Sequence, residues 1–265
     1  MLEKKKNTRH ILGISGGKDS AALAIHLRDR VPEMEYVFCD TGKELKETYE
    51  FIDKLEAYLN AHVKRIPAEL DGFSDDMDFD HFIELYNGYL PSASNRWCTK
   101  DLKLKPFEKF ISDDAVINYV GIRADENRVG YISTKPNVKT VFPFIKDGID
   151  KEGVIKILDD AGVGMPKYYE WRSRSGCYFC FYQSQAEWKG LKERHPELFE
   201  KAKAYEKGDF TWRQDGNLDS IVSQPDVKKK KNKKGPSSSP ILMDILNEDE
   251  DQEEIYEKPC LICHL

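Results

Sequence analysis

The chain has 265 residues and a formal net charge of −6, a balance that excludes a uniformly basic nucleic-acid-binding protein. Hydrophobic residues make up 40% and aromatic residues 11% of the chain, enough for a substantial core, and the length suits either one large domain or one domain plus an appendage. No long apolar stretch follows the first residues, so we expect no signal peptide, no transmembrane helix, no membrane partner and a cytoplasmic location.

Runs typical of strands alternate with runs typical of helices along the chain. This alternation predicts an α/β fold with a doubly wound parallel sheet that helices cover on both faces. Strands are expected at residues 9–14, 35–39, 62–66 and 115–120, and helices at 18–30, 45–60, 79–86, 100–111, 151–161 and 188–207.

A glycine turn of sequence Ser-Gly-Gly-Lys-Asp-Ser separates the first expected strand from the first expected helix. Such a turn points backbone N–H groups at a helix N-terminus, where the helix dipole favours an anion such as phosphate. A carboxylate beside phosphates is explained by a bridging Mg²⁺. The spacing fits neither the common phosphate loop nor the dinucleotide fingerprint, and a plain connecting turn is the simpler alternative. The nucleotide-binding candidates here are Ser15, Gly16, Gly17, Lys18, Asp19 and Ser20.

Polar residues follow the second and fourth expected strands, where ligands of doubly wound sheets bind. Asp40 and Thr41 are expected beside the glycine turn, with Asp40 on Mg²⁺ or a ribose; the alternative is a turn or N-cap role. After the fourth strand, Gly121 joins the nucleotide site, and two arginines five residues apart suit oxyanion recognition. These arginines are Arg123 and Arg128, and the acids expected to orient them or take up metal are Asp125 and Glu126.

Three basic residues, Arg96, Lys100 and Lys103, recur at a spacing of three to four residues. One helical face can carry all three charges and neutralise a polyphosphate or another anionic substrate. A solvated helix face is an equally good interpretation.

A C-x-x-C pair at Cys177 and Cys180 is the sequence's main indication of a metal centre. Six cysteines in a cytoplasmic chain are expected as thiols or metal ligands rather than disulfides. Two thiolates are too few to complete the coordination of a metal ion, so further ligands must come from other parts of the chain. The alternative interpretation is a redox-active cysteine pair. Either a [4Fe–4S] cluster or Zn²⁺ suits such ligands. The candidate partners are Cys98, Cys260, Cys263, His264 and Cys39, the last by default a buried apolar residue.

The composition changes after about residue 213. We expect a nucleotide-binding α/β domain at 1–165, a cysteine-containing helical region at 166–213, a flexible basic linker at 214–240 and an acidic tail at 241–265. Six lysines lie in residues 228–234, and they either form a solvated linker or contact nucleic acid. The tail carries eight acids against one lysine and ends in a C-x-x-C-H sequence.

Residues 9–205 resemble the phosphoadenosine phosphosulfate reductase family within the PP-loop, or ATP pyrophosphatase, superfamily. The resemblance rests on residues 15–20, 39–42, 98–106, 121–128 and 176–180. It implies an adenine nucleotide alpha hydrolase-like fold and cleavage of ATP to AMP and pyrophosphate. The branch that includes DNA-phosphorothioation ATPases implies sulfur transfer or nucleic-acid modification, as in phage defence. The implied catalytic residues are Lys18, Asp19, Arg123 and Arg128.

The same resemblance implies a metal centre at Cys98, Cys177 and Cys180. Iron–sulfur reductases of this kind carry a Cys-Cys pair where this chain has Cys98 and Thr99, so one ligand is missing. We expect the tail to supply it, through Cys263 or Cys260.

Two other functions stay open. A sulfonucleotide reductase would release sulfite through a C-terminal cysteine, although reductases tend to have a degraded glycine turn and this one is intact. A non-catalytic nucleotide-binding subunit would dock partner proteins through residues 226–265. The expected partners are a small-molecule nucleotide, a nucleic-acid or protein acceptor and a second copy of the chain, although the sequence leaves the oligomeric state open.

Overall fold

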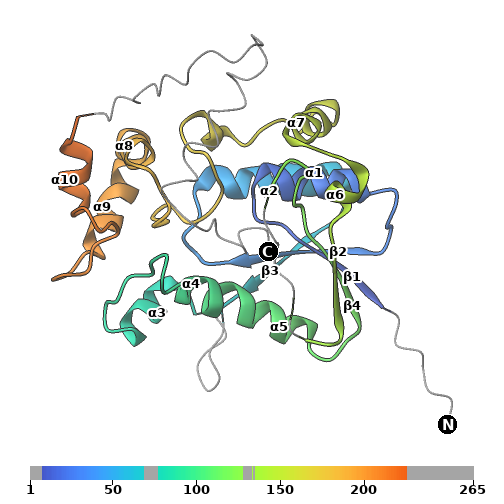
Figure 1. Cartoon of the computed structure of the whole chain (residues 1–265), viewed down its shortest axis with the longest axis horizontal. Helices are drawn as coiled ribbons and strands as arrows, with labels where there is room; N and C mark the ends of the chain where they lie inside the picture. The colour runs from blue at the N-terminus through green and yellow to red at the C-terminus, as the bar shows by residue number, and fades with distance from the viewer. Residues whose placement is uncertain (1–7, 69–76, 128–132, 134, 226–265) are drawn as a thin grey trace, which may run out of the picture.

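The strands form one parallel sheet in the order β3-β2-β1-β4-β5 (Figure 1). The computed structural model describes residues 8–68, 77–127, 133 and 135–225. From β1 the chain adds strands first on one side and then on the other, which confirms a doubly wound α/β fold. The strands are β1 Arg9–Gly13, β2 Met34–Asp40, β3 Val63–Pro67, β4 Val116–Tyr119 and β5 Val138–Val141.

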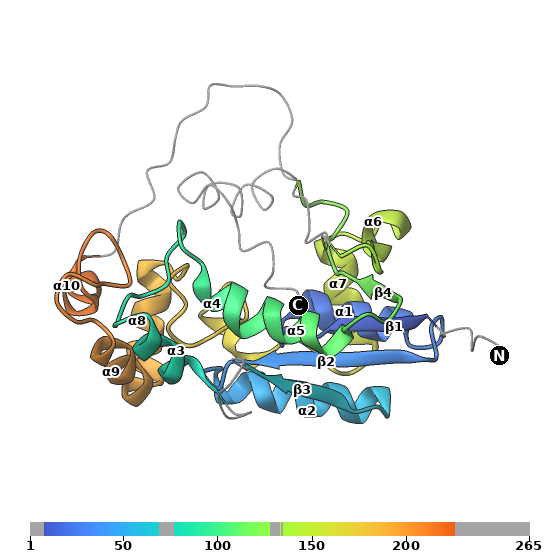
Figure 2. The same cartoon turned by 90° about the horizontal axis from the view of Figure 1, so that it is seen from below.

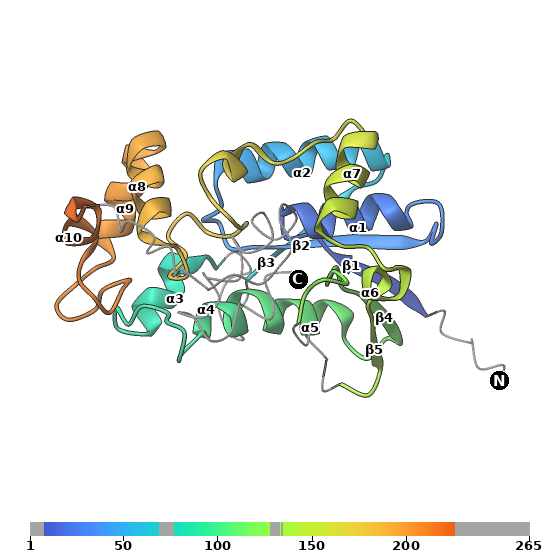
Figure 3. The same cartoon turned by 45° about the horizontal axis from the view of Figure 1, so that its top comes forward.

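Both faces of the sheet are covered, as a parallel sheet requires (Figure 3). Neighbouring residues of β1 point to opposite faces: Leu12 packs in the cluster beneath α1, α2 and α7, whereas Ile11 packs in the cluster beneath α5. The first group of helices is α1 Lys18–Leu27, α2 Lys46–Leu59, α6 Pro143–Asp147 and α7 Lys151–Asp160. The other is α3 Phe79–Leu85, α4 Trp97–Thr99, the π turn η1 Lys100–Leu104 and α5 Lys105–Ile111.

The C-terminal helices gather at one end of the molecule, far from β4 (Figures 1 and 2). After the short 3₁₀ turn η2 Lys167–Glu170 come α8 Gln185–Arg194, α9 Pro196–Ala204 and α10 Leu218–Ser223. They share an aromatic core with α3 and α4, in which the Phe179 ring lies 4.2 Å from Phe79 and 4.9 Å from Trp212 between centroids. The helical region expected at 166–213 therefore packs on residues of the preceding segment.

Two expectations about the C-terminal part are wrong. The single helix expected at 188–207 is two helices, because Pro196 lacks an N–H and disfavours helix at His195; it starts α9 instead. Residues 218–223 of the linker expected at 214–240 form a helix instead, since α10 packs on α8 and buries Leu218 and Ile221. Residues 226–240 of the expected linker and the whole acidic tail lie outside the described residues.

None of the helices in the described ranges is both long and apolar enough to cross a membrane.

Candidate functional site

The glycine turn connects β1 to α1 in a conformation that only glycine accepts readily. Gly16 has a φ of +73°, and a Cβ there would lie 2.3 Å from Thr48 Cγ2. A Cβ on Gly17 would lie 2.8 Å from Ser175 Oγ. Ser20 Oγ accepts from the Ser15 amide at 3.1 Å and donates to the Gly17 carbonyl at 3.2 Å, which closes the turn. The local sequence thus builds a tight, buried cradle at a helix N-terminus.

Opposite charges alternate at the mouth of this turn. Asp19 accepts from Lys18 Nζ at 3.3 Å and from Arg123 Nη1 at 3.2 Å, and all three side chains are largely buried. Burial opposes a charged Lys18, but Tyr169 and Asp19 outweigh it and raise the pKa of the ammonium. The structure therefore brings two predicted catalytic cations to one carboxylate, from segments 104 residues apart.

The loop after β4 fixes Arg123 from its other side. Asp125 accepts from Arg123 Nε at 3.0 Å and Glu126 from Nη1 at 2.9 Å, so both acids orient the guanidinium. Although burial opposes the charge, these carboxylates raise the pKa of Arg123. A Cβ on Gly121 would lie 3.1 Å from the Asp19 carbonyl oxygen, so this glycine lets the loop approach the turn. Arg128 lies outside the described residues.

Asp40 and Thr41 end β2 with separate contacts. Asp40 Oδ1 accepts from the Gly42 amide at 2.9 Å and from Tyr49 Oη at 2.8 Å, which is a turn role. Thr41 Oγ1 lies 3.1 Å from Cys177 Sγ and donates to Glu44 Oε1 at 3.2 Å. In this arrangement Asp40 has no contact with Lys18 or Arg123, and Thr41 faces the C-x-x-C segment.

Two tyrosines of η2 complete the turn and were missed by the sequence analysis. Tyr168 Oη donates to the Gly16 carbonyl at 2.7 Å, and the Tyr169 ring lies 5.1 Å from Lys18 Nζ. Tyr169 Oη also accepts from the Lys18 amide at 3.5 Å. These tyrosines lie about 150 residues from the turn, and no sequence motif links them to it. The contact arises only because η2 packs on α2.

A buried polar group lies between the turn and the cysteine pair. Cys177 Sγ donates to Glu44 Oε1 at 3.8 Å, and burial raises the pKa of both groups. The second oxygen of Glu44 is buried without a hydrogen-bond partner in the part of the chain that the structure describes. The nearby Lys103 ammonium acts against both pKa shifts.

The predicted metal ligands are only partly assembled. Cys177 and Cys180 lie on one turn, and Cys98 borders the same aromatic core. Among the described residues, no three Cys, His, Asp or Glu side chains are arranged to hold a metal ion. Cys263 lies outside the described residues, and Cys39 is a buried thiol with a pKa raised to about 12 by burial.

The three basic residues do not share one α-helical face. Arg96 precedes α4 and stacks its guanidinium over the Tyr182 ring at 5.4 Å. Lys100 and Lys103 lie on the π turn, which changes their angular separation. Lys100 is exposed, whereas Lys103 is half-buried and its carbonyl accepts from Cys39 Sγ at 3.5 Å.

The doubly wound sheet and the Ser-Gly-Gly-Lys-Asp-Ser turn define an α/β protein of the PP-loop superfamily. Residues 9–146 match the phosphoadenosine phosphosulfate reductase domain, and the chain belongs to that family.

Similar proteins include a 28% identical, uncharacterized protein of Methanocaldococcus jannaschii, matched over 72% of this chain and 40% of its own length. The tRNA-specific 2-thiouridylase MnmA of Hydrogenovibrio crunogenus is 25% identical over 49% of this chain and 37% of its own. The chain thus spans less than half the length of these relatives. The phosphoadenylyl-sulfate reductase of Candida auris is a structural neighbour with a TM-score of 0.48, at 14% identity, covering 64% of this chain and 81% of its own.

Proposed function

We propose that this protein binds Mg-ATP at the PP-loop and cleaves it to AMP and pyrophosphate, transferring the adenylyl group to an acceptor. The observation that carries the proposal is the buried array of Lys18, Asp19 and Arg123 at the N-terminus of α1. An acceptor oxygen would attack the α-phosphorus while the bond to the bridging α–β oxygen breaks. Pyrophosphate leaves with the electron pair of that bond. Sulfur, nitrogen or water then attacks the activated acceptor, and AMP leaves with the electron pair of the acceptor–oxygen bond that breaks.

The chain's own groups supply positioning and charge. Lys18 and the first N–H groups of α1 would hold the departing pyrophosphate, while Arg123 would stabilise charge on the α-phosphate. Because Asp19, Asp125 and Glu126 outnumber the two cations, a bare polyphosphate would be repelled. This excess of carboxylate supports Mg²⁺ as the partner of ATP, with Asp19 the nearest oxygen ligand; Mg²⁺ would neutralise phosphate charge.

Sulfur transfer or nucleic-acid modification, including a defence pathway, is the context we propose. The support is the family itself and the relative named a tRNA-specific 2-thiouridylase. A cysteine-bound [4Fe–4S] cluster or Zn²⁺ belongs to the same proposal. The described cysteines are not arranged as a metal site, so no step is assigned to such a centre.

The decisive experiment separates the products of Mg-ATP labelled at the α-phosphate. We expect AMP and pyrophosphate, and loss of at least about 100-fold in rate for Lys18→Ala and Asp19→Ala, because one removes the buried cation proposed to hold pyrophosphate and the other the carboxylate proposed to hold Mg²⁺. Lys146→Ala is the matched control, since Lys146 is exposed on α6. Formation of ADP, or tight binding of adenylyl sulfates with sulfite release, would overturn the proposal.

A further inference from the structure

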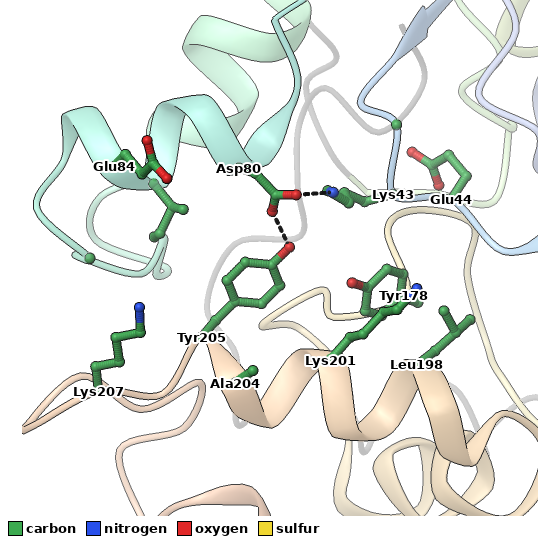
Figure 4. Close-up of a pocket in the computed structure, with 13 residues that line it drawn as sticks. Lys43, Glu44, Asp80, Glu84, Tyr178, Leu198, Lys201, Ala204, Tyr205 and Lys207 are labelled. Atoms are coloured by element: carbon green, nitrogen blue, oxygen red, sulfur yellow. Dashed lines mark hydrogen bonds and ion pairs between the residues drawn. The ribbon is translucent and has the colours of Figure 1, made fainter.

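A cavity of about 560 Å³ opens between α3 and α9 (Figure 4). Three of its polar side chains bond to one another: Asp80 accepts from Lys43 Nζ at 2.6 Å and from the Tyr205 hydroxyl. Figure 4 shows these contacts joining α3, the segment after β2 and α9, so they link the C-terminal helices to α3. The two tyrosines of η2 have a different place, because both contact the PP-loop itself.

A carboxylate and an aromatic ring hold the Lys18 ammonium. Asp19 Oδ2 accepts from Lys18 Nζ at 3.3 Å, and the same nitrogen lies over the Tyr169 ring, 5.1 Å from its centroid. A cation within about 6 Å of an aromatic centroid is attracted by the negative face of the ring. The attraction is stronger where water is largely excluded, and the Lys18 side chain is only 12% exposed. The Tyr169 ring is therefore an energetic partner of the ammonium.

The fold fixes the position of this ring. Tyr168 stacks on it with the two centroids 4.9 Å apart, and Tyr168 Oη donates to the Gly16 carbonyl at 2.7 Å. Tyr168 is buried, and within η2 the Tyr169 amide donates to the Pro166 carbonyl at 3.1 Å. The aromatic pair and the backbone of the turn thus hold one another, so the ring is in place before a nucleotide binds.

The Tyr169 hydroxyl makes a weaker contact at the N-terminus of α1. It accepts from the Lys18 amide at 3.5 Å, which is longer than the usual range of about 2.7–3.2 Å. The N-cap of α1 is Gly17, which has no side chain to accept this N–H. A phosphate oxygen makes a shorter, charge-assisted bond to such an amide. A bound phosphate would therefore replace the hydroxyl at this N–H and leave the ring over the lysine.

The ring and the carboxylate affect phosphate binding in different ways. A carboxylate accepts an N–H of the ammonium and repels phosphate, whereas a neutral ring carries no charge that would repel it. Because Asp19 is the proposed Mg²⁺ ligand, its attraction for Lys18 would be shared with the metal. The Tyr169 ring is thus suited to keep the ammonium in place while nucleotide is bound.

We propose that Tyr169 is a positioning residue of the PP-loop: its ring holds the Lys18 ammonium at the phosphate cradle, and its hydroxyl gives up the Lys18 amide to a phosphate oxygen. The inference deepens the proposed function and rests on it, because the phosphate concerned belongs to the departing pyrophosphate. Since Tyr169 acts through Lys18, loss of the ring should matter only when the lysine is present. The ring, and not the hydroxyl, is the part that the reaction requires.

Calorimetry on the full chain measures the affinity for Mg-pyrophosphate and for a non-hydrolysable Mg-ATP analogue. Tyr169→Leu should weaken both affinities about tenfold, because a largely desolvated cation–π contact is lost. Tyr169→Phe keeps the ring and should bind as tightly as the unchanged chain or up to about threefold tighter, because the competing hydroxyl is gone. At saturating Mg-ATP the rate should fall about tenfold for Tyr169→Leu and stay within about threefold for Tyr169→Phe.

The matched control is Tyr58→Leu. Tyr58 lies on α2 and forms a cation–π contact of the same kind, with the Arg28 guanidinium 5.2 Å from its ring centroid. Arg28 is the C-cap of α1, at the opposite end of that helix from the turn. The control variant should leave both affinities within about twofold. Urea unfolding of each variant separates a loss of stability from a loss of affinity.

A double-mutant cycle tests whether Tyr169 acts through Lys18. In a Lys18→Ala chain, Tyr169→Leu should change the affinity for Mg-pyrophosphate by less than about twofold, because the ammonium that the ring holds is absent. A merely structural role of the tyrosine would give the same loss in both backgrounds.

The outcomes separate this inference from the function on which it rests. Equal losses for Tyr169→Phe and Tyr169→Leu, or an undiminished loss in the Lys18→Ala background, would overturn the positioning role while the formation of AMP stands. Formation of ADP would overturn the proposed function alone, since the affinity for Mg-pyrophosphate still reports the contact between ring and lysine. An unchanged chain that binds neither probe would overturn both.

Discussion

At the residue scale, the candidate site depends on backbone positions that tolerate no side chain and on charges held by burial. Gly16 and Gly17 leave room for Thr48 and Ser175, which come from α2 and from the C-x-x-C segment. The charges of Lys18, Asp19 and Arg123 are mutually compensated in a nearly dry environment. Small changes at these positions should therefore have large effects.

Gly16→Ala combines backbone strain with a steric clash. A left-handed φ costs about 1–2 kcal/mol for a residue with a Cβ, and overpacking adds about 1–3 kcal/mol. Gly164 separates the two contributions, because it has a φ of +67° and a Cβ there would meet no atom of the described residues within 4 Å. In urea titrations Gly164→Ala should lose only the strain component. Equal losses of unfolding free energy in the two variants would show that the Thr48 side chain moves aside without an energetic penalty.

At the element scale, the ends of helices place the functional loops. Glu187 on α8 accepts from the amides of Ser173 and Ser184, both at 2.7 Å, and from Ser173 Oγ at 2.8 Å. One carboxylate thus caps α8 and anchors the segment that leads to Ser175 and the PP-loop. The same carboxylate therefore stabilises both α8 and the segment that leads to Ser175.

Glu187 should make stability depend on pH. Burial opposes its charge, but the hydrogen bonds from Ser173 and Ser184 outweigh it and lower the pKa. Because the folded pKa lies below the unfolded value of about 4.3, the contribution is complete above that value and is lost as pH falls through the folded pKa. Glu187→Gln should therefore cost about 1.5–3 kcal/mol at pH 7 and less below about pH 4.

Unfolding by urea at several pH values measures this effect. Glu193→Gln is the control, because Glu193 is an exposed acid on the same helix. A cost for Glu187→Gln that does not change between neutral pH and about pH 3.5 would show that the charge of Glu187 is not what stabilises the cap.

At the scale of the whole molecule, residues distant in sequence meet at the carboxyl end of the sheet. The C-terminal helices pack on α3 and α4 and hold the C-x-x-C segment against β2 and the glycine turn. The predicted metal centre would depend on the tertiary structure, because its ligands are expected from residues 98, 177, 180 and 263, which are far apart in the sequence.

Metal analysis of anaerobically purified full-length variants tests that centre. We expect Cys98→Ser, Cys177→Ser, Cys180→Ser and Cys263→Ser each to lower the iron or zinc bound per chain by about half or more, because each removes a thiolate. Cys39→Ser should leave it unchanged, since that thiol is buried and neutral. Metal content that is indifferent to all of these changes would exclude the centre.

Local patterns were sufficient for most of the fold. Apolar runs flanked by turn residues placed β1 to β4 and α1 to α3 within a few residues, because their signals lie within one element. They missed β5, a four-residue strand with two adjacent polar residues, and α10, which is short and depends on packing against α8. The sequence patterns also failed to predict the π turn and the helix break before Pro196, since each is a departure from regular α-helix.

The sequence by itself determined the turn of residues 15–20, the strands β1 to β4 around it and the charges that follow β4, because each is encoded by adjacent residues. Only the tertiary structure decided what surrounds them: Tyr168 and Tyr169 on the turn, Glu44 beside Cys177, and the cavity between α3 and α9. These contacts join segments more than about 100 residues apart in the chain. Burial of apolar surface and close packing in the folded chain determine which residues meet in these contacts. Neither effect produces a recognisable spacing of residues in the sequence.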